Sequence, residues 1–266
     1  METTYLTCEP GSFHVWIGTG LPSLFSKGDE PMKVKKRFFA LTTILLVVLL
    51  SSVSTAGAKP SLQLDPGNFV SKVDNPYFPL EPGRTYIYRG ETEGVPTRDV
   101  MIVTSDTKVI LGVTTIIVRD QAYEDRVLIE DTFDWYAQDK AGNVWYFGED
   151  TKELDENGNV ISTEGSWEAG VNGAEPGIIM EAHPKKGDKY QQEFAAGVAE
   201  DMAQVIGFED SFCVRYGCFE NVLVTREWTP LERGVVENKY YAPGVGFIFG
   251  VMVKGGDEQT ELVRVR

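Results

Sequence analysis

The sequence predicts an all-β protein: an antiparallel meander built from two similar halves, forming a curved sheet or half-barrel with a long Gly/Pro-rich central loop. Segments rich in β-branched and aromatic residues alternate with Gly, Asn and Asp, which is typical of strands and turns. Segments of the first half also recur in the same order in the second half. No stretch shows apolar residues at helical spacing, so no long helix is expected.

Turn residues separate the expected strands. Residues 61–83 are punctuated by Pro and Gly and are expected to wrap the surface before the first regular strand. The strand pattern fails from Gly165 to Gly187, which predicts the central loop with at most a short helix. The expected strands are 84–90, 98–110, 113–124, 126–138, 143–150 and 159–165 in the first half, and 189–194, 199–208, 220–228, 235–242, 246–253 and 260–266 in the second.

Three collinear matches indicate an internal duplication. The segment from Gly83 to Tyr86 recurs as Gly187 to Tyr190, "GVTTIIVRD" recurs as "GCFENVLVTRE", and "WYAQDKAGNVWYFG" recurs as "YYAPGVGFIFG". The matches predict two pseudo-repeats, at about 76–164 and 180–266, within a single β domain of residues 59–266. Aromatic residues at equivalent hairpin positions are then core and cross-strand pairs.

Residues 32–58 have the pattern of an export signal. Met32 begins a basic stretch, an uncharged and mostly apolar run follows, and Ala56-Gly57-Ala58 fits the small-residue cleavage rule. The alternative is an uncleaved anchor, since 38–58 is about long enough to cross a bilayer. Both interpretations place the β domain outside the cytoplasm, as a secreted or periplasmic protein or as a domain tethered to the membrane. Residues 1–31 are interpreted as a mis-assigned N-terminal extension.

Composition restricts the partners. The net charge of −15 and the pI near 4.6 argue against nucleic acid and against an anionic lipid surface, because both need a basic face. No phosphate-binding loop, nucleotide motif or haem motif is present, so no cofactor is expected.

The cysteine pattern agrees with export. Cys213 and Cys218 lie on either side of a Tyr-Gly turn, which predicts a disulfide across a hairpin in an oxidising compartment. A metal site at these thiols would need further Cys or His ligands, and the predicted mature chain has one His.

The stretch "NPYFPLEPG" and the motifs "DWYAQDKAGNVWYFGE", "QEFAAGVAED" and "EWTPLERGVVENKYYAPGVG" resemble a family of uncharacterised exported prokaryotic proteins. This resemblance covers nearly all of the β domain and implies no activity. More loosely, a meander ending in "YYAPGVG" is similar to half-barrel domains of the lipoprotein-carrier type, which hold acyl chains. That similarity concerns the fold alone.

Candidate catalytic residues are few. Glu193, Glu200 and Asp201 interrupt a strand-like region and have no acidic counterpart in the first half, so they are the candidates for a carboxylate-dependent hydrolase together with His183. The alternative is that they are surface acids on edge strands, which discourage aggregation. His183, which precedes a Pro in a loop, is otherwise structural or solvent-exposed.

An apolar ligand and a calcium ion are the other candidates for binding. Trp167 and Met180 of the central loop, with Trp135 and Trp145, are the residues expected to contact an apolar or amphipathic ligand in the concavity of the sheet. The alternative is that they pack the two halves together. An acidic turn offers weak calcium ligands, foremost Asp150 and Asp155, but lacks the EF-hand spacing, and a solvated hairpin is the alternative.

Sequence alone therefore predicts an exported, non-catalytic β-sheet protein that binds an apolar or amphipathic ligand. A carboxylate-dependent hydrolase and a structural protein of the cell envelope are the alternatives.

Overall fold

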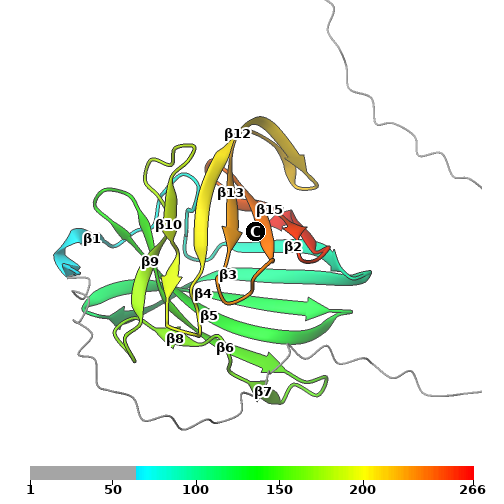
Figure 1. Ribbon diagram of the computed structural model, residues 1–266, viewed down its shortest axis with the longest axis horizontal. Helices are drawn as coiled ribbons and strands as arrows, with labels where there is room; N and C mark the ends of the chain where they lie inside the picture. The colour runs from blue at the N-terminus through cyan, green and yellow to red at the C-terminus, as the bar shows by residue number, and fades with distance from the viewer. Residues whose placement is uncertain (1–63) are drawn as a thin grey trace, which may run out of the picture. The chain divides into compact units, whose positions relative to one another are not determined.

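In a computed structural model, residues 64–266 form one antiparallel sheet of sixteen strands (Figure 1). These residues contain no α-helix and one short 3-10 turn, η1 (Pro66–Asn68), which the Asp65 carboxylate caps. The predicted all-β fold class is thus confirmed. The extension at 1–31 and the signal or anchor at 32–58 lie outside the described residues. Within the described part, no helix is long and apolar enough to cross a membrane.

Long strands alternate with tight turns through both halves, as the spacing of Gly, Asn and Asp predicts. The strands of the first half are β1 (Phe69–Val70), β2 (Thr85–Thr92), β3 (Val95–Ile110), β4 (Val113–Glu124), β5 (Val127–Asp139), β6 (Val144–Leu154) and β7 (Val160–Ser162). After the central strands β8 (Trp167–Glu168) and β9 (Glu175–Met180) come β10 (Lys189–Gln191), β11 (Glu193–Phe194), β12 (Met202–Val214), β13 (Gly217–Trp228), β14 (Val236–Ala242), β15 (Gly246–Lys254) and β16 (Gln259–Val265).

Both halves are meanders in which neighbouring strands pair in sequence order. The last strand, β16, pairs with β2, and this pairing joins the halves into one sheet. The strand order is β10-β12-β13-β14-β15-β16-β2-β3-β4-β5-β6-β9-β11. Figure 1 shows β3 to β6 lying side by side, with β12 and β13 running at a steep angle to them.

The two ends of this sheet meet at one short segment, residues 189–194, which we call the seam. β10 pairs with β12 at one end, and β11 pairs with β9 at the other. Only Gln192 separates these two strands, and its backbone N–H donates to the Asp201 carbonyl oxygen at 2.8 Å. The sheet is therefore a nearly closed half-barrel.

Matched backbone hydrogen bonds begin the two halves. The Gly83 N–H donates to the Val103 carbonyl and the Gly187 N–H to the Val205 carbonyl, both at 2.8 Å. Both glycines have a positive φ, which glycine adopts at little cost. Val103 and Val205 are both fully buried. The duplication that these positions suggest stays a prediction.

The buried side chains form two clusters. The larger one includes Tyr86, Val103, Leu223, Ile248 and Leu262, and therefore spans both halves. The smaller one packs around Trp135, Phe147 and Trp167 beneath the central segment. These apolar clusters supply the main stabilisation of the sheet, since burial of such side chains contributes about 1.5 to 3 kcal/mol each.

The central segment contains more strand than its sequence indicated. Residues 165–187 include β8, which pairs with β6, and β9, which links β6 to the seam. The described residues show no helix there. The Pro and Gly of "AEPGIIM" hid β9 from the sequence analysis. Glycine is needed at position 177 because the backbone of Gln191 and Gln192 passes close to it.

The predicted disulfide is confirmed. Cys213 and Cys218 are directly paired at the end of the β12–β13 hairpin and are bonded to each other. Beyond them the turn contacts β16, where the Arg215 guanidinium pairs with Glu261 at 2.8 Å. The exposed bond therefore reinforces a hairpin that cross-strand pairing already forms.

The closure of the sheet at the seam can be tested with a single methyl group. A Cβ at position 177 would lie 2.4 Å from the backbone carbon and oxygen of Gln192, so Gly177→Ala should push β9 and the seam apart. We expect a loss of about 2 kcal/mol in the free energy of unfolding, measured by urea denaturation. At Gly217 the nearest atom to an added Cβ is 3.7 Å away, so Gly217→Ala is the matched control. Equal stability of the two variants would contradict closure.

Candidate functional site

A band of carboxyl groups lies on the face of the sheet that also carries the larger apolar cluster, which we call the inner face. In an antiparallel sheet, directly paired residues share a face, as do residues two apart on one strand. Asp120 pairs with Met101 and Thr132, and thus shares the face of Val103 and Asp134. The same reasoning places the following residues there, here called the inner acids: Asp99, Asp120, Asp134, Glu149, Asp201, Glu227 and Glu237, with Glu193 joining them from the seam.

Tyr146 holds two of the inner acids together. Its hydroxyl oxygen lies 2.6 Å from Asp134 Oδ1 and 2.9 Å from Glu149 Oε2. A phenol has one hydrogen and can donate to only one carboxylate, so the other carboxyl must carry a proton and donate to the phenol oxygen. Burial accordingly raises the pKa of Glu149 to about 7 and the pKa of Asp134 well above its usual range.

Asp99 and Asp120 extend this arrangement across β3 and β4. Burial, followed by the charge of Asp120, raises the pKa of Asp99 to about 7. Burial also raises the pKa of Asp120 to about 6. Both groups therefore titrate at pH values where most carboxyl groups are already fully ionised.

Glu193 and Asp201 form a hydrogen-bonded pair next to the seam. Burial is the largest cause that raises the pKa of each, and the charge of Asp201 raises the pKa of Glu193 further. Two carboxyl groups that are hydrogen-bonded to each other must share a proton, since one of them has to donate. The Trp167 indole N–H donates to Glu193 Oε2 at 2.9 Å.

One ammonium group stands among the inner acids of the second half. Lys239 Nζ lies 3.0 Å from Glu227 Oε2 and 3.6 Å from Glu237 Oε2. Glu227 Oε1 also accepts from Thr225 at 2.7 Å and from the Tyr241 hydroxyl at 3.1 Å. The carboxylates raise the pKa of Lys239 well above its usual value, against the effect of burial. This part of the face shows how an ammonium is held.

The inner acids of the two halves influence one another. The charge of Glu149, on β6, raises the pKa of Glu193 at the seam, and the charge of Asp201 raises that of Glu149. The halves therefore bring their carboxyl groups within electrostatic range across the curved sheet. At neutral pH such a face offers protonated carboxyls as donors and ionised ones as acceptors.

Three buried polar atoms near these acids have no hydrogen-bond partner within residues 64–266. They are Asp120 Oδ1, the Tyr190 hydroxyl and Gln192 Nε2. Tyr190 and Gln192 keep only 8% and 3% of their exposure, so neither group is satisfied by bulk solvent. Unpaired buried polar groups are uncommon and costly, which makes this region a candidate binding site.

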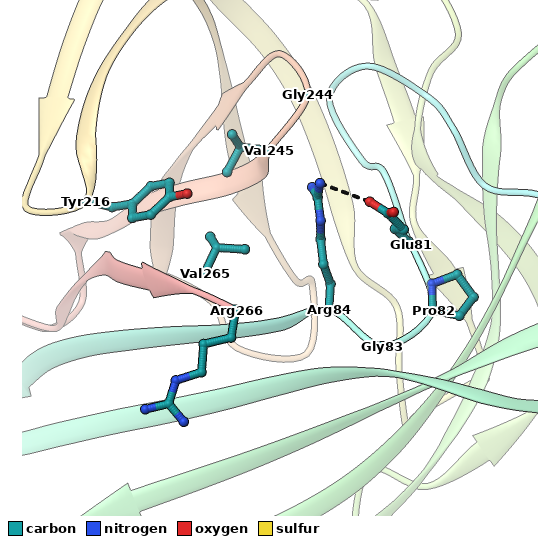
Figure 2. A pocket seen from close by; sticks show the side chains of 9 residues that line it. All are labelled: Glu81, Pro82, Gly83, Arg84, Tyr216, Gly244, Val245, Val265 and Arg266. Carbon is teal, nitrogen blue, oxygen red and sulfur yellow. Dashed lines mark ion pairs between the residues drawn. The ribbon is translucent and has the colours of Figure 1, made fainter.

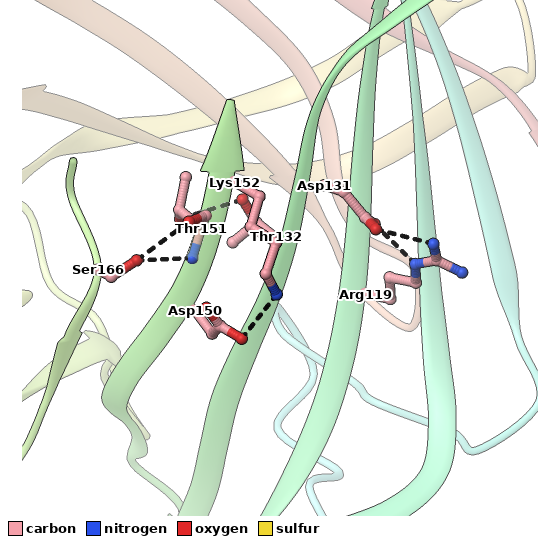
Figure 3. A network of polar contacts seen from close by, with 7 residues as sticks. All are labelled: Arg119, Asp131, Thr132, Asp150, Thr151, Lys152 and Ser166. Carbon is pink, nitrogen blue, oxygen red and sulfur yellow. Dashed lines mark hydrogen bonds and ion pairs between the residues drawn. The ribbon is translucent and has the colours of Figure 1, made fainter. Parts of the chain in front are cut away.

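Acids on the opposite, outer face have bases as partners. Arg119 holds Asp131 with two nitrogens, at 2.7 and 2.9 Å, and Lys152 holds Asp150 at 2.9 Å (Figure 3). On the inner face of the same strands, by contrast, no base within the described residues forms an ion pair with Asp134. Asp134 and Glu149 are thus held together through a hydroxyl and a proton, whereas Asp131 and Asp150 are held by cations.

The structure brings together some of the residues singled out from the sequence. Glu193, Asp201 and Trp167 are in direct contact. Glu200 instead accepts from the Gly197 backbone N–H at 2.8 Å and closes a turn. His183 is exposed, and no hydrogen bond or ion pair of the described residues includes it. The predicted grouping of three acids with a histidine is therefore reduced to two acids and a tryptophan.

The other predicted ligand contacts are dispersed. Met180 is fully buried in the larger cluster, whereas Trp135 is buried in the smaller one beneath the Lys108 ammonium. Trp145 donates to Asp139 Oδ2 at 3.0 Å. These three side chains pack or brace the sheet, and their role as ligand contacts stays a prediction.

The weak calcium candidates already have partners. Asp150 is paired with Lys152, and Asp155 accepts from the backbone N–H groups of Asn157 and Asn159 within its own turn. In the part of the chain that the structure describes, no group of three or more His, Cys, Asp or Glu side chains could hold a metal ion.

A separate hollow of about 560 Å³ lies beside the end of the chain (Figure 2). Arg84 and Tyr216 are among its lining residues, and Arg84 is paired with Glu81 at 2.9 Å. Because that guanidinium already has a carboxylate partner, this hollow offers less for a ligand than the inner face does.

Sequence reasoning missed Asp134, Glu149 and the Glu227–Lys239 pair. Asp134 and Glu149 lie in an aromatic hairpin whose two faces are both buried, so alternation did not reveal which face is inner. The sequence "FDWYAQDKAGNVWYFGED" did contain a signal, because Asp134 alternates with the aromatic residues Phe133 and Trp135 and so lies on the opposite face of the strand.

Comparisons with known proteins leave the identity of the chain open. No protein-family model matches the sequence, and no curated protein matches it. Among solved structures, a protein described as exported, with a YmcC-like fold, from Bacteroides fragilis shares 12% identity with a TM-score of 0.44. A protein described as a lipoprotein from Parabacteroides distasonis shares 11% identity with a TM-score of 0.40. Each match covers 71% of this chain and 98% of the other. At these TM-scores neither likeness bears on what the chain does.

Protons on the inner acids make stability depend on pH. An acid whose pKa is higher in the folded state stabilises the fold fully below its unfolded pKa and loses this contribution as the pH rises through the folded pKa. For Glu149 the window runs from about 4 in the unfolded chain to about 7 in the fold. The free energy of unfolding should thus fall between about pH 4 and pH 7, with Glu149 contributing at most about 1.4 kcal/mol per pH unit.

Urea denaturation of two variants checks this sign. Glu149→Gln removes a proton-binding inner acid and should flatten the pH dependence, whereas the matched Glu156→Gln, in an exposed turn, should leave it as in the native chain. A pH profile that is unchanged in Glu149→Gln would exclude a proton at this position.

Proposed function

We propose that this chain is an exported, non-catalytic binding protein that takes a small cationic amphipathic molecule on its inner face. The ammonium group would lie among the inner acids of β3 to β6, and the apolar part would lie against the core residues of the same face. The observation that carries the proposal is that, within residues 64–266, these acids form no ion pair with a cation, whereas Lys239 pairs with two inner acids of the second half.

Several contacts favour a cation as the ligand. Asp120 Oδ1 is buried and has no hydrogen-bond partner among residues 64–266, so it can accept from a donor of the ligand. Asp99 and Glu149 keep protons near pH 7 because burial penalises their charged forms, and a bound ammonium would offset that penalty. A cation would therefore bind in exchange for protons, since metal and amine ligands both favour ionised carboxyls.

The apolar part of the ligand follows from the rest of the inner face. Met101 and Tyr136 are half-buried on strands that carry the acids, and both pack against the larger cluster. An alkyl or ring system beside the ammonium could cover them, and its burial would contribute about 25 cal/mol per Å² of apolar surface.

Export is supported by two independent features. The sequence at 32–58 has the pattern of a signal or anchor, and the chain forms an exposed Cys213–Cys218 disulfide. Disulfides of this kind persist in oxidising compartments outside the cytoplasm.

A carboxylate-dependent hydrolase is the second candidate, and the Glu193–Asp201 pair favours it. Two carboxyl groups that share one proton can act as general acid and general base. However, Glu193 is 9% exposed and its oxygens already contact Asp201 and Trp167. Turnover of a chromogenic ester or glycoside that is lost in Glu193→Gln would establish this candidate over the first.

Binding of dodecyltrimethylammonium, a fixed cation with an alkyl chain, tests the proposal. Isothermal titration calorimetry, below the micelle concentration, should show binding that is tighter at pH 8 than at pH 5.5, because protons compete for the acids at the lower pH. Asp120→Asn should weaken binding about tenfold, the usual effect of losing one charged partner. Asp106→Asn makes the same charge change at an exposed site and is the matched control.

Two outcomes would overturn the proposal. Dodecyl maltoside, a neutral amphiphile with the same alkyl chain, could bind as tightly as the cation. Alternatively, the two Asp→Asn variants could weaken binding equally, which would mean that the net charge of the chain attracts the probe.

A further inference from the structure

A row of five side chains crosses the outer face on β15, β16, β2, β3 and β4. Consecutive members are directly paired: Phe249 with Glu261, Glu261 with Arg89, Arg89 with Arg98, and Arg98 with Tyr123. Directly paired residues point to the same side of a sheet. The row therefore places two guanidinium groups side by side between two aromatic rings.

The pairing of Arg89 with Arg98 is unfavourable as it stands. Like charges directly opposite each other destabilise neighbouring strands. Within residues 64–266, no carboxylate forms an ion pair with either arginine, while Glu261 is taken up by Arg215, at 2.8 Å to Nε and 2.9 Å to the backbone N–H. Arg98 instead lies over the Tyr123 ring at 5.2 Å, which holds its guanidinium in place.

Two further guanidinium groups converge on the same place. Arg126 comes from the β4–β5 turn, where it has a φ of +73°, and Arg215 comes from the end of the disulfide hairpin. Together with Arg89 and Arg98 they line a hollow of about 690 Å³. Its other lining residues include Tyr123, Phe249, Glu91, Asp125 and Glu261. Four arginines and three acids line this hollow, which gives it a small local excess of positive charge in a chain with a net charge of −15.

We propose that this hollow is a binding site for a sugar phosphate, held by its phosphate group between Arg89 and Arg98. The site lies on the outer face and is separate from the inner acids.

The phosphate follows from the paired guanidinium groups. A phosphate monoester carries close to two negative charges above pH 7 and several acceptor oxygens, so it can neutralise two neighbouring arginines at once. A carboxylate brings one charge and would leave one arginine unbalanced. The planar donors of arginine also match the geometry of phosphate oxygens.

The sugar follows from the remaining lining. Phe249 and Tyr123 close the two ends of the row with partly exposed rings, against which the apolar side of a pyranose can pack. Glu91 and Asp125 have carboxylate oxygens that can accept hydrogen bonds from sugar hydroxyls. The same acids disfavour a ligand with more negative charge than one phosphate.

Glucose 1-phosphate is the probe that tests this site, with the whole chain at pH 8 and isothermal titration calorimetry as the measurement. Binding is expected at a Kd of about 1 mM or tighter, with glucose and inorganic phosphate each binding more weakly than the combined molecule. Arg89→Gln should weaken binding about tenfold, since a charged hydrogen-bonding partner is lost. The matched control is Arg226→Gln, which removes the same charge from an exposed position outside the hollow.

The unfolding temperature of the ligand-free chain provides a second test, which does not depend on binding. Arg89→Gln relieves the like-charge pair, so the variant should unfold at the same temperature as the native chain or at a higher one. If Arg89→Gln does not fold, Arg98→Lys keeps the charge but loses the planar donor pair, and it should still weaken binding. The proposal is overturned if glucose 1-phosphate does not bind, if inorganic phosphate binds as tightly, or if Arg89→Gln and Arg226→Gln weaken binding equally.

Discussion

The inner acids cannot all be ionised while they share one face of a nearly closed sheet. Burial penalises each charge, and each ionised neighbour adds to the penalty. The fold meets this constraint in two ways: Lys239 neutralises Glu227 and Glu237 in the second half, and protons neutralise Asp134 or Glu149 and Glu193 elsewhere. The dependence of stability on pH and the proposed affinity for cations both follow from this constraint.

The seam connects this constraint to the fold. Glu193 belongs to β11, which closes the sheet against β9, and its partner Asp201 directly precedes β12. The proton shared by the two acids therefore lies where the ends of the sheet meet. The cation proposed for the inner face would ionise acids next to this pair, so its binding would act on the seam through charge.

Much of the fold could be predicted from the sequence, because strand signals are local. The strand expected at 113–124 agrees with β4 at both ends, and the disulfide follows from two cysteines around a turn. β9 was missed because its Pro and Gly, which normally end a strand, serve the close approach of the seam at Gly177. Glu193 and Asp201 could be singled out because they break the repeat, but the hydrogen bond from Trp167 to Glu193 spans 26 residues of sequence.

The hollow on the outer face could not be predicted from the sequence either. Arg89, Arg98, Arg126 and Arg215 are scattered through the sequence among many acids, and only the register of β2, β3 and β16 brings them together. An overall charge of −15 argues against nucleic acid and an anionic lipid surface, yet net charge does not describe a local surface. Cross-strand pairing, which sequence patterns specify weakly, decides both candidate sites.

Infrared spectroscopy at pH 7 tests the central claim most directly, because the carbonyl stretch of a protonated carboxyl is separate from that of a carboxylate. The inner acids predict a protonated-carboxyl band in the folded chain at this pH, reduced in Glu193→Gln and again when Asp134→Asn is added. The absence of this band, or a band that neither substitution changes, would contradict an inner face held together by protons.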